Sequence, residues 1–451
     1  MERYCFIHAA DLHLDTPFEG FRKTAPEVHE QLLDASLDAW DALVALALER
    51  EALFLLLGGD LYDGADRGVR AQLRFRRGVA KLCGEGIEVF AVHGNHDPVE
   101  EGWSAIREWP SGMTVFTSSE VSSVPVIRDG ERLATIHGIS YARRDTRENL
   151  SARFRRGDQP GLQIGLLHCN LGGEAGHENY SPCSIADLCA RDLDYWALGH
   201  VHRHNIVREG DPWIVYPGNL QGRSPQPGER GAKGAVVVEV EGDRIAGVTH
   251  VALDRVRFAE SVVNAAGCRD LGELEELLSQ SAETQRADAG SRGVMLRARV
   301  RGADERLRAD LERRETLDDL IGALRDRFEG LVPFLWWDAL QIDSPVRPQP
   351  ASDGRADSFS ESLRDVCANL LSDPERSTSM LESSFEKLPA RNKRIELPSL
   401  DTCDPAELLR EGRELALSLL LSDPLSDPLQ EPLPQQSPDS SPERLNRTEP
   451  E

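Results

Sequence analysis

Short apolar runs alternate with amphipathic stretches over roughly the first 250 residues of the chain. The run at 52–57, which reads ALFLLL, is typical of a buried strand. Apolar residues at helical spacing predict helices over 27–50 and 69–83. The predicted strands of this part are 4–9, 52–57, 87–92, 162–167, 195–198, 213–216 and 235–240. Strand–helix alternation followed by strand-rich sequence predicts an α/β sandwich of two sheets covered by helices.

A second, smaller set of elements follows between residues 255 and 343. Its predicted order is strand 257–263, helix 271–278, strand 294–300, helix 317–328 and strand 334–342. This order fits either a βαββ-like or a βαβαβ-like unit, and both alternatives stay open. Residues 344–354 are rich in proline, glycine and serine, and they predict a linker.

The C-terminal part has a different pattern. Apolar stripes predict short helices over 359–371, 379–388 and 405–421. From Ser422 onward, seven of thirty residues are prolines and the tetrapeptide SDPL occurs twice. We expect this tail to be disordered, because such a composition buries too little apolar surface to offset the loss of chain entropy.

Charge narrows the classes of function. The formal net charge is −25, which argues against a broad basic surface and counts mildly against a stand-alone nucleic-acid binder. A metal centre can nevertheless supply local positive charge that a count of residues misses. The eight cysteines include no CxxC pair, so neither a zinc ribbon nor a thioredoxin motif is indicated. With no signal-peptide pattern and no bilayer-length apolar run, we expect a cytoplasmic protein with reduced thiols.

Five short motifs fall at the ends of predicted strands. They are ADLHLD (Asp11, His13), GGDLYD (Asp60), GNHD (Asn95, His96, Asp97), LLHCN (His168) and GHVH (His200, His202). Each motif is weak by itself, because pairs such as His-x-His occur by chance in many chains. As an ordered set, each following an apolar strand, they indicate a functional site. The alternative is that these residues are turn residues that cap strands.

The residue types suit a centre with two divalent ions. Two ions a few ångströms apart can hold the attacking and the leaving oxygen of a phosphoryl transfer, and oxygen and nitrogen ligands without thiolate suit manganese. Asp60 is expected to bridge the ions. Asp11, His13 and His202 are expected to complete one site, and Asn95, His168 and His200 the other. Two carboxylates against two dications leave two positive charges, which a phosphodiester and an activated hydroxide can neutralise.

His96 follows a candidate ligand, so we expect it near the metals rather than on them. There it would stabilise developing charge or protonate the leaving oxygen, with Asp97 orienting its ring. The alternative is that His96 only orients its neighbours. His137 is expected to be a structural histidine.

Two interpretations stay open for each of several other residues. His177 and Tyr180 border the substrate groove or are structural loop residues. Arg223, Arg230 and Lys233 contact a nucleic-acid backbone or belong to a solvated loop. Trp336 and Trp337 are core residues or a stacking platform.

The motifs, together with WIVYPGNLQGR at 213–223, resemble the SbcD-type DNA-repair exonucleases of the calcineurin-like metallophosphoesterase superfamily. FIHAADLHLDTPF at 6–18 and HENYSPCS at 177–184 are most similar to the bacterial YhaO-like branch. The resemblance rests on specific motifs over 4–240 and on element order alone over 255–343. It implies a four-layer sandwich of two mixed sheets flanked by helices, with a small α+β capping domain and a helical C-terminal region.

The resemblance also implies a division of the chain and a set of partners. We expect a catalytic domain over 1–254, a capping domain over 255–345, a helical region over 346–421 that is a candidate for binding a partner, and a disordered tail over 422–451. It implies manganese-dependent cleavage of DNA with two ions per chain, a coiled-coil ATPase of the SbcC/YhaN kind as partner, and a homodimer. The sequence itself has no Walker A motif.

One position departs from the archaeal and eukaryotic nucleases of this family. They have a histidine three residues after the bridging aspartate, where this sequence has Asp63. The bacterial branch also has an acid there. A carboxylate cannot act as a cationic partner of the scissile phosphate.

Three functions remain as hypotheses. The first is a DNA exonuclease in repair. The second is a phosphoesterase acting on small nucleotides or phosphoproteins, which the acidic composition favours. The third is a non-catalytic subunit that binds DNA or a partner, against which the complete ligand set argues.

Overall fold

The computed structural model describes residues 3–16, 26–64, 68–100, 105–106, 108–172 and 180–343, and scattered residues between 366 and 413. Chain contacts divide the protein into two compact units, Met1–Pro345 and Val346–Glu451. The described residues of the second unit are short helical pieces, in which Leu370 and Leu409 are buried together. Most of the predicted region 346–421, and all of the tail 422–451, lies outside the described residues. No described helix is long and apolar enough to span a bilayer.

The first sheet contains the strands from which three of the five motifs emerge. Its order is β12-β11-β1-β2-β3-β4. The bounds are β1 Arg3–Ala9, β2 Phe54–Leu57, β3 Glu88–Ala91, β4 Met113–Val115, β11 Gly234–Glu241 and β12 Arg244–Ala252. Strands β1 to β4 are parallel, whereas β11 and β12 pair antiparallel. The C-terminal ends of four strands therefore lie along one edge.

The second sheet supplies the other two motifs. Its order is β5-β6-β7-β8-β10-β9, and β6, β7, β8 and β10 are parallel. The bounds are β5 Ser122–Arg128, β6 Glu131–Gly138, β7 Leu162–His168, β8 Tyr195–Gly199, β9 Asn205–Arg208 and β10 Trp213–Tyr216. The two outer strands, β5 and β9, pair antiparallel with their neighbours.

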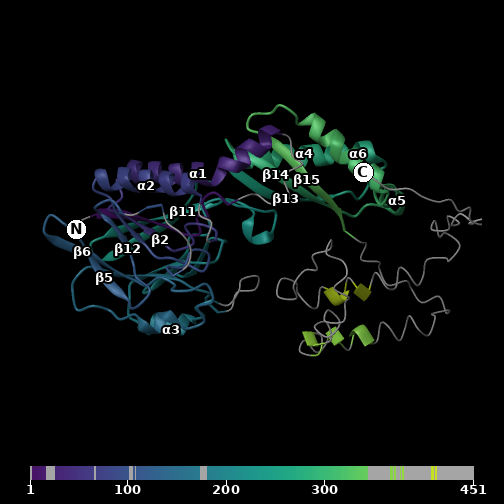
Figure 1. Cartoon of the computed structure of the whole chain (residues 1–451). Coiled ribbons are helices and arrows are strands. Elements are labelled where there is room, and N and C mark those ends of the chain that lie inside the picture. The colour runs from purple at the N-terminus through teal and green to yellow at the C-terminus, as the bar shows by residue number, and fades with distance from the viewer. Residues whose placement is uncertain are drawn as a thin grey trace, which may run out of the picture. The chain divides into compact units, whose positions relative to one another are not determined.

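The two sheets pack face to face with helices outside them. Alternate residues of a strand point to opposite faces, so Phe54 and Leu56 of β2 enter the core between the sheets. Leu55 and Leu57 instead pack under helices α1 (Pro26–Glu49) and α2 (Val69–Gly84). Figure 1 shows α1 and α2 side by side over one sheet, with α3 (Ile185–Cys189) on the opposite side. This arrangement confirms the predicted sandwich of two mixed sheets flanked by helices.

A third sheet follows the sandwich. Its strands β13 (Val256–Asn264), β14 (Gly293–Arg301) and β15 (Leu335–Ile342) are all parallel. The helices between them are α4 Leu271–Ala289, α5 Glu305–Leu311 and α6 Arg314–Arg327. The order β–α–β–α–α–β settles the open alternatives in favour of a βαβαβ-like unit. This sheet has a core of its own, which includes the fully buried Trp337.

Helix α1 joins the sandwich to the third sheet. A separate buried cluster consists of Val28, Leu32 and Ala35 of α1 with Val256, Phe258, Met295 and Phe334 of the third unit. Just before β13, the buried Asp254 accepts hydrogen bonds from Arg257 and Arg292, at 3.0 Å and 2.9 Å from their Nε atoms. Apolar packing and the two ion pairs of the buried Asp254 thus hold the third sheet against the sandwich.

Strands β4, β5, β6, β9 and β12 were not among the predicted elements. The β5–β6 hairpin shows why, because Pro125 lies within β5 and interrupts its strand pattern. Strand β5 forms the edge of its sheet, where proline removes no interior ladder bond. Asp129 and Gly130 connect the two strands with φ values of 53° and 84°, which suit a tight hairpin turn.

Mutation of Leu55 can test how much its burial beneath helices α1 and α2 stabilises the fold. Leu55 is fully buried in the central strand β2, whose end leads to Asp60, whereas Leu33 on α1 is 46% exposed. We expect Leu55→Ala to lower the free energy of unfolding by about 2–5 kcal/mol because it leaves a cavity. The same change at Leu33 should cost less than about 0.5 kcal/mol. Urea denaturation followed by circular dichroism measures both, and equal losses would contradict the packing described.

Candidate metal centre

The loops after five strands bring the predicted ligand residues to one place. The segments that follow β1 and β2 run side by side. Asp11 N donates to Gly59 O and His13 N donates to Asp60 O, both at 3.0 Å. Asn95 follows β3 in the same sheet. His168 ends β7, and His200 and His202 follow β8, in the second sheet. The adjoining C-terminal edges of the two sheets therefore form the site.

Four of these residues have a left-handed backbone. The φ values are 51° at Asp11, 41° at His13, 51° at Asp60 and 102° at His200. Residues other than glycine rarely adopt this backbone conformation, and each one that does lowers the stability of the fold by roughly 1–3 kcal/mol. Strain of this kind persists where the surroundings hold it, and it is common at functional sites.

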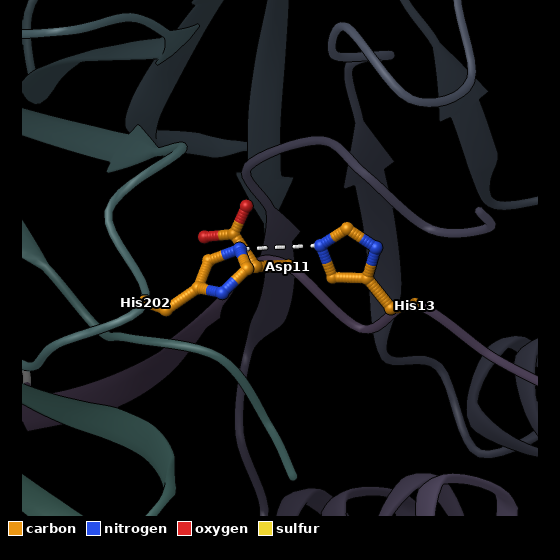
Figure 2. A group of neighbouring side chains, drawn as sticks. All are labelled: Asp11, His13 and His202. Carbon is orange, nitrogen blue, oxygen red and sulfur yellow. Dashed lines mark hydrogen bonds between the residues drawn. The ribbon is translucent and has the colours of Figure 1, made fainter. Parts of the chain in front are cut away.

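Asp11, His13 and His202 form the first group of possible ligands. Their ligand atoms all lie within 4.8 Å of one another. Figure 2 shows the two rings facing each other beside the Asp11 carboxylate, with 3.3 Å between the two Nε2 atoms. Asp11 and His13 are buried, and the side chain of His202 is 13% exposed. Two imidazole nitrogens and a carboxylate oxygen converging in this way suit a divalent ion.

Asn95, His168 and His200 form a second group next to it. Asn95 Oδ1 lies 2.9 Å from His168 Nε2 and 3.2 Å from His200 Nδ1. Asp60 lies between the two groups, because its Oδ2 is 3.4 Å from His168 Nε2 and 3.9 Å from His13 Nε2. The structure thus brings all seven predicted ligand residues into one connected cluster.

Two glycines leave the space that these side chains occupy. A Cβ at Gly94 would lie 2.3 Å from Asp60 Oδ1, and one at Gly59 would lie 2.6 Å from His168 Nδ1. Gly59 also has a φ of 99°. The glycines of GGD and GNHD therefore serve close approach at the site as well as turning the chain.

Two of the ring nitrogens that face away from the cluster, in His168 and His202, have hydrogen-bond partners. His168 Nδ1 donates to Gly58 O at 2.9 Å, which leaves Nε2 to face Asn95 and Asp60. His202 Nδ1 lies 2.6 Å from Glu229 Oε1, and Glu229 is 7% exposed. Partners of this kind fix the tautomer and the orientation of metal-binding histidines. Glu229 was not predicted, because its loop, GRSPQPGERGAK, carries no signal that its acid is buried.

The ring of His96 is held by Asp63. The two side chains meet at 2.5 Å between Nδ1 and Oδ1, and Arg223 Nη1 donates to the other oxygen of Asp63 at 2.9 Å. Asp97, expected to orient His96, has a different set of bonds. Its carboxylate accepts from the backbone of Leu61 and Gly94 and lies 3.1 Å from His93 Nδ1. The orienting bond on Nδ1 of His96 therefore comes from Asp63.

The electrostatics of the cluster favour a cation. Burial opposes ionisation of Asp60, yet His168 and His96 hold the pKa of this carboxyl well below its usual range. Burial also opposes protonation of His168, but Asp60 raises the pKa of its imidazole to about 9. Burial and Arg223 lower the pKa of His13 well below its usual value, so that ring keeps a lone pair for a ligand bond. The residues present therefore fit divalent ions.

The other predicted residues lie in varied surroundings. Tyr180 is buried, with its ring centroid 6.0 Å from that of His200, and His177 lies outside the described residues. His137 is bonded to Ser123 and Gln163 inside the second sheet, as expected of a structural histidine.

The two tryptophans of the third sheet also differ. Trp337 is a core residue, whereas Trp336 is partly buried with the Arg325 guanidinium 4.4 Å from its ring centroid. Arg325 therefore occupies a face of Trp336 that a stacked base would need.

Comparison with known proteins identifies the family. The model of the calcineurin-like phosphoesterases matches residues 6–204. The chain is 31% identical over 368 residues to "Uncharacterized metallophosphoesterase YhaO" of Bacillus subtilis, covering 82% of this chain and 88% of that protein. It is 28% identical over 227 residues to "DNA double-strand break repair protein Mre11" of Thermoplasma acidophilum, covering 48% of this chain and 56% of that one.

The Mre11 protein of Sulfurisphaera tokodaii is 25% identical over 254 residues, which is 54% of this chain and 61% of that protein. The chain thus spans little more than half the length of these two Mre11 relatives, but most of the Bacillus protein. With the family model, the long match to the Bacillus protein and the strand-end cluster in agreement, the chain belongs to the calcineurin-like metallophosphoesterases.

Proposed function

We propose that the protein is a metal-dependent phosphodiesterase that cleaves DNA, most simply as an SbcD-type exonuclease in DNA repair. The observation that carries the proposal is the convergence of seven oxygen- and nitrogen-bearing side chains at the adjoining edges of two sheets. The similarity to proteins named for DNA double-strand break repair supports DNA as the substrate.

In this proposal Asp11, His13 and His202 hold one divalent ion, and Asn95, His168 and His200 hold the other. Asp60, which faces both groups, would contribute its carboxylate to both ions. The absence of thiolate from the set favours Mn²⁺ or a similar ion. Two such ions, when bound, would supply an acidified water as nucleophile and positive charge at the phosphate.

His96 is the residue that handles the proton of the leaving group. Its Nδ1 is engaged by Asp63 at 2.5 Å, so Nε2 is the nitrogen available to the substrate. Asp63 raises the pKa of His96 against the opposing effect of burial, which favours the imidazolium form that protonates the leaving oxygen. We therefore assign to Asp63 the orienting role first expected of Asp97.

Arg223 supplies the positive charge that Asp63 cannot. Its guanidinium is bonded to Asp63 Oδ2, and its side chain is 20% exposed. A guanidinium donor held in this way suits a phosphate oxygen. We propose that it contacts the DNA backbone next to the scissile bond, and that Tyr180, whose ring lies beside that of His200, also borders the substrate.

The substrate is tested by comparing esters under one set of conditions. With Mn²⁺, we expect the protein to degrade linear duplex and single-stranded DNA, and chelation with EDTA should abolish the reaction. Cyclic nucleotides, p-nitrophenyl phosphate and a phosphopeptide serve as parallel substrates. Efficient cleavage of those compounds with intact DNA would replace the nuclease proposal by the small-substrate function that the acidic charge favours. Two bound ions without cleavage of any ester would indicate a binding subunit.

His96 is tested by separating metal binding from turnover. We expect His96→Ala to retain both ions and to lower kcat by about 10²–10⁴-fold, the usual contribution of a general acid. His29→Ala, on helix α1, is the matched control and should leave kcat unchanged. Metal content by mass spectrometry and initial rates on a DNA substrate give the two readouts. Wild-type turnover by the His96→Ala protein would remove this residue from the mechanism.

Asp63 is tested by a change that removes its charge and little else. We expect Asp63→Asn to lower kcat by about 10–100-fold, while the affinity for Mn²⁺ stays near wild type, because His96 loses its ionic partner. The exposed Asp158→Asn is a control with the same change of charge. An equal fall in metal affinity would show that Asp63 supports the ligands rather than His96.

The partner and the location follow from the family resemblance. We propose a coiled-coil ATPase of the SbcC/YhaN kind as partner, since this sequence has no Walker A motif of its own. A homodimer and a cytoplasmic location belong to the same proposal. Co-purification from the native host, followed by size-exclusion chromatography with light scattering, tests the partner and the dimer together.

A further inference from the structure

The loop from Gln221 to Lys233, which we call the clasp loop, is held in place from two sides. Its sequence is rich in glycine, proline and charge, which suggested a solvated loop or a contact with nucleic acid. On one side it reaches His202 and Asp63. On the other it bonds to the backbone at the start of the third sheet. The loop therefore connects the proposed metal site to β13.

The centre of the clasp loop is the carboxylate of Glu229. Its Oε1 lies 2.6 Å from His202 Nδ1. Its Oε2 accepts hydrogen bonds from Asn219 Nδ2 at 2.7 Å and from the backbone N of Arg223 at 2.9 Å. The residue is 7% exposed. A buried carboxylate in which both oxygens are engaged has a fixed position, and it can only accept hydrogen bonds.

These bonds connect Glu229 to two functional parts of the site: the ring of His202, and the Arg223–Asp63 pair that contacts His96. Because Oε1 can only accept, Nδ1 of His202 must carry the proton, and Nε2 presents its lone pair toward His13. Through Oε2, Glu229 also fixes the backbone of Arg223, whose guanidinium holds Asp63 against His96. One side chain thus supports a proposed ligand and the proposed proton donor.

The remaining contacts of the clasp loop keep Glu229 in place. Two residues of β13 contact the loop. Phe258 O accepts a hydrogen bond from Gly231 N at 2.9 Å, and Glu260 forms a 2.6 Å ion pair with Arg230. Lys233 Nζ, in a buried side chain, donates to the backbone oxygen of His202 at 2.6 Å.

Gly222 allows this packing. A Cβ at Gly222 would lie 2.4 Å from Glu229 O, so only glycine permits the observed approach of the two backbone segments.

We propose that Glu229 is a positioning residue of the metal centre, which sets the tautomer and orientation of His202 and, through Arg223, the alignment of Asp63 with His96. The inference rests on the proposed function, because it takes His202 to be a metal ligand. It adds a residue outside the five strand-end motifs and makes the clasp loop part of the catalytic machinery.

The test is Glu229→Gln in the full-length chain, with Mn²⁺ binding measured by isothermal titration calorimetry without DNA. Glutamine turns one of the two acceptors into a donor. If its amide nitrogen faces His202, the proton moves to Nε2 and the ligand lone pair is lost. If it faces Asn219 and Arg223, two donors oppose it. We expect the affinity for one of the two ions to fall about 10–100-fold.

Controls separate this role from a general loss of structure. Glu239→Gln, an exposed acid on β11, should bind both ions as the wild type does. In a His202→Ala background, Glu229→Gln should cause no further loss of metal affinity, because its effect on the ion runs through that ring. If Glu229→Gln does not fold, Glu229→Asp keeps the charge and both acceptors but withdraws them by one methylene, and it should give a smaller loss.

The outcomes distinguish this inference from the proposed function. Unchanged affinity for both ions in a folded Glu229→Gln protein, or in the Glu229→Asp protein where that variant replaces it, would overturn the role of Glu229 alone. A further loss in the His202→Ala background would also overturn it. A wild-type protein that binds no Mn²⁺ would overturn the metal centre itself. Metal binding with cleavage of bis(p-nitrophenyl) phosphate but not of DNA would reject only the substrate and leave the role of Glu229 standing.

Discussion

The buried carboxylate of Asp60 organises the site more than any other group. Its backbone oxygen accepts from His13 N, its Oδ1 accepts from His96 N at 2.9 Å, and its Oδ2 faces His168 of the second sheet. A charge buried at 1% exposure is costly unless positive or hydrogen-bonding groups surround it. The loops after β1, β3 and β7 therefore have to converge on Asp60, and the neighbouring glycines keep the space that this requires.

The need to surround Asp60 also explains the strained backbone at the site and the groups that orient its histidine rings. Left-handed conformations at Asp11, His13, Asp60 and His200 are retained because sheets on both sides determine where the loops can run. The rings are then oriented from behind by a backbone oxygen at His168, by Glu229 at His202 and by Asp63 at His96. Each orienting group comes from a different part of the chain, so the geometry of the site depends on the whole sandwich and on the clasp loop.

An acidic protein can act on a polyanion if positive charge is concentrated where the reaction occurs. The chain carries a formal charge of −25, yet its proposed ligand cluster pairs only two carboxylates with four histidines and one asparagine. Arg223, next to Asp63, adds a fixed cation beside His96. The charge that attracts a phosphodiester is in this view local and largely supplied by bound ions, which a net charge does not reveal.

The strands that lead into the five motifs, and the polar groups directly after them, could be predicted from the sequence. Strong apolar runs made β1, β2, β3, β7 and β8 recognisable, and short polar motifs directly after such strands meet wherever parallel strands share an edge. The edge strand β5 was not predicted, because Pro125 interrupts its strand pattern. At the edge of a sheet the proline removes no interior ladder hydrogen bond, so the strand still forms. The fold of the whole domain places Asp63, and not Asp97, against Nδ1 of His96, and Glu229 against Nδ1 of His202. These pairs are separated by 33 and 27 residues, and their contact depends on how whole loops pack, which no local pattern of residues encodes.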